Sequence, residues 1–382
     1  MRITALCSFV ALMGCGNHPT SPGGAHDLGG AHDLGAAHDL EAAHDLHSAS
    51  DLRPGADLLS APMDMAVAPT VDMTTNTVAD MSGTATGDMA TASGNAIKTV
   101  FVILMENANW SQIKGSNSAP YINQTLLPMA SHAEMYFNPP GNHPSLPNYL
   151  WLEAGDNLGV TADGTPSQYD QSTTDHLVTQ LESAGHTWKA YVEDIDGKSC
   201  PLSDSGLFVT RHVPMLFFDD VTNTNDPTAT RCIDHVRPFS ELQGDLTNNK
   251  VADYNFITPN LCDDMHGSDV LAGDFTCAPL LTDLINKGDT WLSMNVPAIL
   301  ASSAFQNGGA LFILWDEGEG SLLDGPIGFI ALSPAAKGGG YSNGVQYTHS
   351  STLRSVEEVF GVPLLRDAAN ATDLSDLFNR FP

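Results

Sequence analysis

One serine lies in a setting that suits a nucleophile. Ser145 stands between Pro144 and Pro147, which restrict the backbone on either side of it. The apolar run 149–152 that follows is typical of a buried helix, so the sequence predicts the Ser145 hydroxyl at a helix N-terminus. Free N–H groups and the helix dipole favour an anion there, which suits attack on a phosphoryl group. The alternative is that Ser145 only caps the helix.

Further polar groups follow apolar runs that predict strands. The runs 98–105, 254–258 and 310–315 are rich in the residues of strands buried on both faces of a mostly parallel sheet. In open α/β sheets, ligands collect at the carboxyl ends of the strands. Acids gathered there repel one another unless a cation lies among them, and the alternative is a set of solvated turns. The polar residues after these runs are Glu106, Asn107, Asp264, His266, Asp316 and Glu317.

The remaining elements alternate as in an α/β protein. The pattern predicts a helix at 177–184, strands at 187–192 and 327–332, and, after a glycine-rich loop, a helix that ends at Gly361. His349 comes just before that last helix, so we expect it to face the same site. The segment 197–238 has no regular pattern and is predicted to be an inserted lid or specificity loop.

The N-terminus predicts export. Residues 1–15 contain Arg2, a short apolar run, and Leu-Met-Gly-Cys ending at Cys15, which resembles a bacterial lipobox whose cysteine is lipidated. An ordinary cleaved signal or a chance apolar run is the alternative, and the run is too short to span a bilayer. Gly16 offers no inner-membrane retention signal, so we expect a lipid anchor in the outer membrane, facing the periplasm or the surface.

Residues 16–96 predict a disordered acidic tether. Four Ala-His-Asp-Leu repeats and four Asp-Met pairs leave too few apolar residues for a core. The histidines of the repeats alternate with aspartates, and metal collection is the alternative to simple low-complexity drift. These histidines are His26, His32, His38 and His44.

The globular part, residues 97–382, is strongly acidic. It holds 34 acidic and 13 basic residues, a balance of about −21. Such a surface repels nucleic acid, which we exclude as a partner. A phosphate site here would need a cation that the side chains do not supply. We expect contact with the membrane only through the lipid anchor, and the sequence carries no signal for an oligomeric state.

The four cysteines outside the signal indicate disulfides. An even number in an exported domain predicts two bridges, and proximity favours Cys200 with Cys232 and Cys262 with Cys277, although three pairings are open. A zinc–thiolate site is the alternative, but no pair has Cys-x-x-Cys spacing.

Taken together, these motifs resemble the metal-dependent phosphoesterases that include bacterial and fungal acid phosphatases and phosphatidylcholine-type phospholipases C. The likeness covers residue 98 to the C-terminus. It rests on Met105-Glu106-Asn107, His143-Pro144-Ser145-Leu146-Pro147-Asn148-Tyr149, Asp264-Met265-His266, Trp315-Asp316-Glu317-Gly318 and His349.

The resemblance implies a fold, a site and a mechanism. The fold would be the alkaline-phosphatase-like α/β/α sandwich with a mostly parallel central sheet. Ser145 would attack phosphorus in line and form a phosphoserine that water cleaves, while His266 or His349 protonates the leaving group, which suggests an acidic optimum. One or two divalent metal ions would be held by Glu106, Asn107, Ser145, Asp316 and Glu317, with His143, Asp264, His266 and His349 lining the phosphate pocket or a second metal position.

Three functions are compared on this basis. The phospholipases commonly continue into further C-terminal domains, so we expect an acid phosphatase-like phosphomonoesterase. A phospholipase C or another phosphodiesterase is the alternative, because the segment 197–238 is long enough to shape a lipid pocket. A surface lipoprotein that binds metal without catalysis is the alternative of another class.

Overall fold

The computed structural model describes residues 96–268, 276–277, 281–318 and 324–382. The predicted signal sequence and nearly all of the predicted tether lie outside these residues. Within them, eight strands form one sheet in the order β4-β3-β5-β1-β6-β7-β2-β8. The strands are β1 (Thr99–Met105), β2 (Ser131–Phe137), β3 (Trp188–Val192), β4 (Val236–Pro238), β5 (Tyr254–Thr258), β6 (Gly309–Trp315), β7 (Phe329–Leu332) and β8 (Tyr341–Thr348).

The sheet is mostly parallel, as predicted. Only β7 runs antiparallel to its neighbours β6 and β2, and every other pair in the described sheet is parallel. Strand β1 lies at the centre, and six of its seven residues are buried. Because helices cover both faces, the strand carries an uninterrupted apolar sequence.

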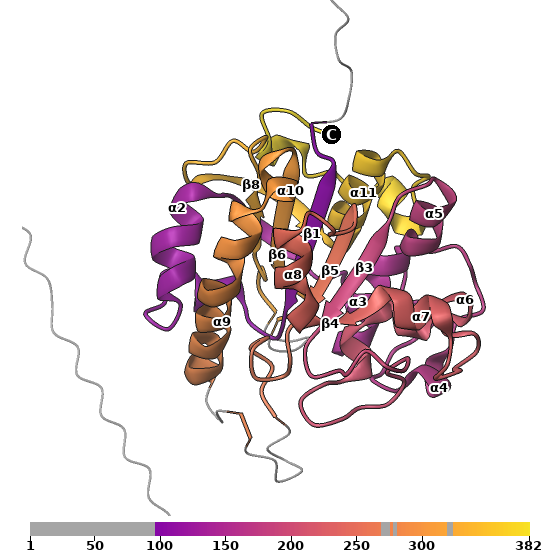
Figure 1. Cartoon of the computed structure of the whole chain (residues 1–382). Coiled ribbons are helices and arrows are strands. Elements are labelled where there is room, and N and C mark those ends of the chain that lie inside the picture. Colours follow the sequence, from indigo (N-terminus) through magenta and orange to yellow (C-terminus); the bar gives the residue numbers. More distant parts are fainter. Residues whose placement is uncertain (1–95, 269–275, 278–280, 319–323) are drawn as a thin grey trace, which may run out of the picture. The chain divides into compact units, whose positions relative to one another are not determined.

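Helices cover both faces of the sheet (Figure 1). In sheet order the chain moves one way from β5 to β6 and the other way from β2 to β3, so right-handed crossovers put the intervening helices on opposite faces. The longer helices are α3 (Ser145–Ala154), α5 (Leu177–Ser183), α8 (Leu242–Thr247), α9 (Leu281–Ala301) and α11 (His349–Phe360). Helices α3, α5 and α11 pack together, and α8 and α10 (Ser303–Gln306) pack on α9.

Short helical turns complete the described part. They are α1 (Trp110–Ile113), η1 (Ile122–Leu126), α2 (Leu127–Met129), α4 (Pro166–Tyr169), η2 (Thr210–His212), η3 (Pro214–Phe217), α6 (Asp219–Thr222), α7 (Thr230–His235), η4 (Phe239–Glu241), α10 (Ser303–Gln306), η6 (Arg366–Asn370) and η7 (Ser375–Leu377). The segment predicted to be irregular, 197–238, therefore contains η2, η3, α6, α7 and the edge strand β4. Within the described residues, no helix is both long and apolar enough to cross a membrane.

The stretch after β7 differs from the sequence prediction. The glycine-rich stretch after β7 was expected to be a loop, but most of it forms β8, which pairs with β2. Strand β8 lies at the edge of the sheet, and most of its side chains are half-buried or exposed, so it lacks an apolar run.

Both disulfides are confirmed, joining Cys200 to Cys232 and Cys262 to Cys277.

Candidate functional site

The site lies where β1, β5 and β6 end. Strand β1 pairs in register with both neighbours, so the segments after the three strands meet at one edge of the sheet. The backbone N–H of Glu106 donates to the carbonyl of Asp264 at 2.7 Å, and that of Asp316 donates to the carbonyl of Met105 at 3.0 Å. The topology thus brings together three acids that are far apart in the sequence, and all three are buried.

Ser145 is the first residue of α3 and faces Glu106. Its Oγ donates to Glu106 Oε2 at 3.1 Å, and both side chains are buried. Tyr149, one turn further along α3, donates its hydroxyl to the other oxygen, Oε1, at 2.8 Å. Asn107 donates its amide Nδ2 to Oε2 at 3.1 Å. Glu106 is therefore the acceptor shared by the hydroxyl groups of α3 and the amide that follows β1.

The two acids after β6 point into the same region. Asp316 Oδ1 accepts the backbone N–H of Asn107 at 3.2 Å, while its Oδ2 is buried and has no hydrogen-bond partner among the described residues. Glu317 Oε2 accepts the amide of Asn148 at 2.9 Å and lies 2.9 Å from His143 Nδ1. The other ring nitrogen of His143 contacts Asp324 Oδ2 at 2.5 Å. His143 thus lies between two carboxyl groups at the side of the site. Its ring nitrogens contact Glu317 and Asp324, not Ser145 Oγ.

A histidine that the sequence analysis did not identify completes the centre. His212 comes from η2 and is buried, with Nε2 3.1 Å from Glu106 Oε1 and Nδ1 3.2 Å from Asp264 Oδ2. Its ring stacks on Tyr149, with the centroids 4.9 Å apart and the planes at 2°. No spacing rule marked His212, because it lies in the segment that has no apolar periodicity.

His266 lies beside the Glu106 carboxylate. Its Nδ1 donates to the carbonyl of Gly267 at 2.7 Å, which fixes the tautomer and leaves the lone pair on Nε2. The ligand atoms of Glu106, His212 and His266 all lie within 4.8 Å of one another. Imidazoles held by a carbonyl in this way are common at metal sites. These three residues therefore form a candidate metal centre.

His349 is near the centre but is held in another way. It is the first residue of α11 and is fully buried. Its Nε2 donates to the backbone carbonyl of Asp316 at 2.5 Å, and its Nδ1 contacts the hydroxyl of Tyr136 at 3.1 Å. Burial lowers the pKa of His349 to about 4. Neutral and bonded at both nitrogens, His349 fixes the strand end that carries Asp316.

Burial sets the charges of the site. It raises the pKa of Glu106 and of Asp264 well above the usual range, with neighbouring acids adding to the effect on Glu106. Burial likewise raises the pKa of Asp316 to about 6 and, together with Asp316, that of Glu317 to about 10. Burial, then Arg211 and His266, lowers the pKa of His212.

This charge pattern fits a cation. Burial raises the pKa of four acids and lowers that of the imidazole beside them, and a bound positive charge would favour the ionised acids and the neutral imidazole alike. The buried, unpaired Asp316 Oδ2 is a further oxygen that a cation would satisfy. The predicted ligands Glu106, Asn107, Asp316, Glu317 and Asp264 are all brought together, along with Ser145.

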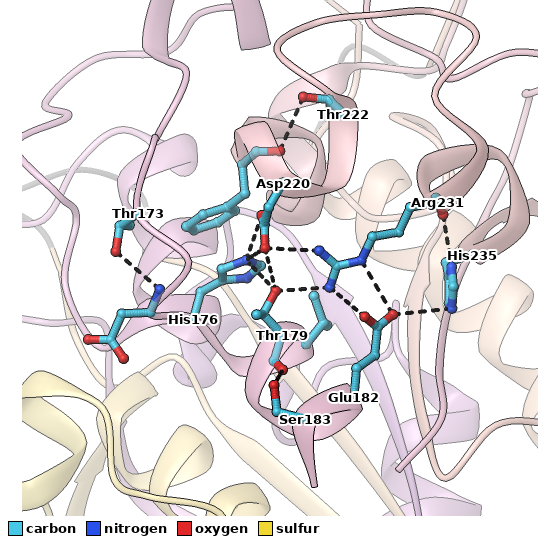
Figure 2. Close-up of polar contacts among 12 residues, drawn as sticks. Thr173, His176, Thr179, Glu182, Ser183, Asp220, Thr222, Arg231 and His235 are labelled. Carbon is cyan, nitrogen blue, oxygen red and sulfur yellow. Dashed lines mark hydrogen bonds and ion pairs between the residues drawn. The ribbon is translucent and has the colours of Figure 1, made fainter. Parts of the chain in front are cut away.

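A second polar cluster fastens the segment that carries His212. His176 is buried and stacks on Phe218, and its two nitrogens contact Glu153 Oε1 at 2.7 Å and Asp220 Oδ1 at 3.1 Å. Burial alone lowers the pKa of His176, but hydrogen bonds to Asp220 and Glu153 raise it further than burial lowers it. Figure 2 shows that Arg231 extends this cluster through ion pairs with Asp220 at 2.9 Å and Glu182 at 2.8 Å.

This cluster links α3 and α5 to the segment 197–238. Glu153 belongs to α3, the helix that begins with Ser145, whereas Asp220 and Arg231 belong to α6 and α7. Because both ends of the cluster are charged and hydrogen-bonded, it holds the segment in one position. His176 is therefore a scaffold residue and not part of the chemistry.

The fold and the site define an α/β protein with a serine hydroxyl set among metal-type ligands. Residues 133–363 match the Phosphoesterase family. The chain belongs to that family and is a phosphoric ester hydrolase.

Curated relatives agree with this assignment. The chain is 27% identical over 279 residues to the phosphatidylinositol-3-phosphatase of Mycobacterium tuberculosis, covering 73% of this chain and 82% of the relative. It is 24% identical to a probable acid phosphatase of Kluyveromyces lactis, covering 74% and 65% respectively. It is 25% identical to a phosphate-repressible acid phosphatase of Penicillium chrysogenum, covering 59% and 51%. The chain thus spans less than two thirds of the two fungal relatives.

Solved structures give a more distant likeness. A protein of the alkaline phosphatase superfamily from Vibrio parahaemolyticus is 7% identical, with a TM-score of 0.45, and the match covers 70% of this chain and 67% of that one. A murine ectonucleotide pyrophosphatase/phosphodiesterase 5 in complex with AMP is 12% identical, with a TM-score of 0.47, covering 74% of this chain and 100% of that one.

Proposed function

We propose that this protein hydrolyses phosphate monoesters, with Ser145 as the nucleophile and a divalent metal ion as cofactor. One observation carries the proposal: the Ser145 hydroxyl, at the start of α3, donates to the buried Glu106 carboxylate in the middle of the candidate metal ligands. A helix N-terminus favours the anion that a serine becomes when it attacks, and it favours the phosphate that the serine attacks.

The proposed reaction has two displacements. Ser145 Oγ passes its proton to Glu106 Oε2 and bonds to phosphorus, while the bond from phosphorus to the ester oxygen breaks and that oxygen leaves as an alkoxide that takes a proton from water. The hydroxide left from that water then attacks the phosphorus of the phosphoserine, the bond from phosphorus to Ser145 Oγ breaks, inorganic phosphate departs, and Glu106 returns the proton to Ser145 Oγ. Tyr149 and Asn107 hold Glu106 in place for the proton transfer.

The metal would be held by two groups of ligands that share Glu106. The first contains the predicted ligands Asn107, Ser145, Asp316 and Glu317, and the second contains His212, His266 and Asp264. A cation bound there supplies a Lewis acid that stabilises negative charge on the reacting oxygens. Because a ligand set of acids and imidazoles suits several first-row metals, a metal series has to identify the ion.

The monoester preference is supported by the relatives, whose names describe phosphatases. No contact in the described site favours a diester. The phospholipase C alternative therefore becomes an arm of the experiment, and so does the metal-binding lipoprotein without catalysis.

The test compares p-nitrophenyl phosphate with p-nitrophenyl phosphorylcholine. We expect wild type to cleave the monoester faster, and Ser145→Ala to lower kcat by about a thousandfold or more. Ser293→Ala, on α9, removes a hydroxyl that bonds only to the carbonyl of Thr290 and serves as the matched control. A chelator should abolish turnover, and one divalent metal should restore it. Faster diester cleavage, or no turnover with any metal, would refute the proposal.

We also propose that the protein is exported and lipid-anchored through Cys15, with the outer membrane as its location. The support is the lipobox-like end of residues 1–15. Cys15→Ser should move the protein from the membrane fraction to the soluble fraction and remove the lipid mass from its N-terminal peptide. A protein that stays in the membrane fraction without Cys15 would contradict the proposal.

A further inference from the structure

One cationic side chain touches the site. Arg211 precedes His212 in η2 and is the only lysine or arginine in the described part of the chain with a contact to the residues discussed above as site residues. Its Nη2 lies 3.4 Å from His266 Nε2, and its Nε lies 3.5 Å from Asp163 Oδ2. The charge of this guanidinium therefore faces the same space as the candidate metal ligands.

The second partner of Arg211 places it beside the nucleophile. Asp163 Oδ1 accepts the backbone N–H of Leu146 at 3.0 Å, and Leu146 is the residue after Ser145. Arg211, Asp163 and the first turn of α3 thus form a continuous chain of contacts. On its other side Arg211 meets His266, so the guanidinium bridges the start of α3 and the loop after β5.

The local backbone is built to hold this position. Thr210, next to Arg211, is buried, and both its backbone N–H and its hydroxyl donate to Asp204 Oδ1, at 2.7 and 2.8 Å. The neighbour on the other side, His212, is stacked on Tyr149. With both neighbours fixed, the backbone of Arg211 is held at the edge of the site.

The stability of the fold does not account for Arg211. The side chain of Asp163 is 37% exposed, and an ion pair at 3.5 Å with such a partner contributes little. Arg211 Nε is buried and forms no hydrogen bond with any described residue, which is a cost to the fold. The remaining guanidinium N–H groups suit a ligand that brings several acceptor oxygens.

We propose that Arg211 binds the phosphate group of the substrate and contacts two of its non-bridging oxygens. A planar guanidinium matches two oxygens of a phosphate, which a lysine cannot do. The domain has a balance of about −21, and a dianion enters a site lined by acids only if local positive charge offsets their repulsion. Arg211 is the side chain of the described site that supplies such charge permanently.

This inference rests on the proposed function and makes it more specific. A phosphate monoester has three non-bridging oxygens and two negative charges, whereas a diester has two such oxygens and one charge. A guanidinium that takes two oxygens gains more from the two charges of a monoester than from the single charge of a diester. Arg211 would therefore set the preference for monoesters over diesters.

The test measures phosphate binding and turnover separately. Inorganic phosphate is titrated into the metal-loaded full-length protein by calorimetry, and we expect Arg211→Ala to weaken its binding at least about tenfold. The same variant should lower kcat/KM for p-nitrophenyl phosphate by about 100- to 1,000-fold, and that for bis(p-nitrophenyl) phosphate by far less. Arg211→Lys should recover part of the loss, and added guanidinium ion should partly rescue Arg211→Ala.

Two controls make the result decisive. Arg237→Ala removes an arginine of similar exposure that pairs with Glu241 away from the site, and it should leave phosphate affinity unchanged. Metal content, measured by mass spectrometry, should be the same in wild type and Arg211→Ala. Unaltered phosphate affinity in Arg211→Ala, loss of metal in that variant, or absence of phosphate binding by wild type would each overturn the inference. If phosphate binding depends on Arg211 but neither ester is cleaved, only the proposed hydrolysis fails.

Discussion

Glu106 is the residue of the site that most of the other site residues contact. Its two oxygens accept from Ser145, Asn107 and Tyr149, and Oε1 lies 3.1 Å from His212. The carboxylate therefore joins the nucleophile to the imidazole half of the candidate metal centre. A change at any one of these partners alters the charge that Glu106 presents to the others, so their effects on activity should not be additive.

His266 has two possible roles that exclude each other. Because Nδ1 donates to Gly267, only Nε2 can bind a metal or carry a proton to the leaving group. We expect the metal role, so His266→Ala should lower metal affinity by about 100-fold or more. Turnover of p-nitrophenyl phosphate and of a phenyl phosphate should then fall equally, and excess metal should partly restore both.

The opposite result would assign His266 to acid catalysis. In that case His266→Ala keeps its metal, still cleaves the p-nitrophenyl ester, whose leaving group needs no proton, and loses activity on the more basic phenoxide. Metal content measured alongside the two rates separates the outcomes.

Sequence reasoning identified the residues that carry recognisable motifs and missed those that do not. Glu106 and Asp316 follow apolar runs, and Ser145 is framed by prolines, so strand ends and a helix start could be located. His212 and Arg211 come from a stretch without periodicity, and only the tertiary packing of η2 brings them to the site. His349 was expected to face the phosphate, and the structure instead shows both of its nitrogens bonded within the fold.

Among the elements, α3 has the most demanding position. Its first residue is Ser145, its second turn supplies Tyr149, and it ends at Gly155 in the left-handed conformation, with φ of 71°. A Cβ at Gly155 would lie 2.5 Å from the carbonyl oxygen of Leu365. The helix that carries the nucleophile is therefore packed tightly at its far end as well.

Gly155→Ala should destabilise the protein more than Gly361→Ala. Both glycines end a helix with a positive φ, but a Cβ at Gly361 would meet nothing within 4 Å. The matched change at Gly361 should cost about 1 kcal/mol in the free energy of unfolding, from the backbone alone. Gly155→Ala should cost about 2 kcal/mol more because of the clash with Leu365. Urea denaturation measures both, and equal losses would contradict the packing at Gly155.

Helix α11 holds a buried acid that should make stability depend on pH. Glu357 Oε1 accepts the backbone N–H of Leu365 at 2.8 Å, Oε2 has no hydrogen-bond partner in the described residues, and burial raises the pKa to about 8. Between the usual carboxyl pKa and 8, the unfolded chain loses the proton that the folded chain keeps. Stability should therefore fall as pH rises through this window.

Glu357→Gln removes the titrating group, so its Tm relative to wild type should rise steadily from pH 4.5 to pH 8. Over that range, the free energy of unfolding of Glu357→Gln relative to wild type should increase by on the order of 1 kcal/mol or more. Glu358→Gln, on the same helix but paired at the surface with Arg354, is the control and should show no such trend. A pH-independent difference at Glu357 would sink the prediction.

The predicted strands at β1, β3, β5 and β6 were found because helices bury both of their faces. Edge strands and short turns could not be predicted in the same way. Strands β4 and β8 border solvent and carry mixed side chains, and the turns of the segment 197–238 are too short for a helical period to appear.

At the scale of the whole molecule, the disulfides and the cluster in Figure 2 fix the segments that reach the site. The bridge between Cys200 and Cys232 closes a loop that contains Arg211 and His212, and the bridge between Cys262 and Cys277 closes one that contains Asp264 and His266. Each covalent link thus restrains two side chains of the candidate site.

Reduction of the disulfides should therefore abolish activity before the protein unfolds. Each bridge contributes about 3 to 4 kcal/mol by restricting the unfolded chain. At moderate temperature and rising reductant, phosphatase activity should fall while the far-UV circular dichroism signal is still native. Replacing each cysteine pair with serine separates the two bridges. Loss of activity only together with global unfolding would show that the bridges stabilise the fold without positioning the site.

The strand order also affects how the chain is made. Strand β1 is synthesised before every other described strand, yet its partners β5 and β6 follow more than 150 residues later, as the pairing of Val100 with Tyr254 shows. Throughout that interval the apolar strand β1 has no pairing partner and is able to bind other chains. We therefore expect β1 to be prone to aggregation in the newly made polypeptide until β6 has emerged. A fragment that stops short of β6 lacks one of the two neighbours of β1 and the acids that follow β6, so we expect it to be inactive.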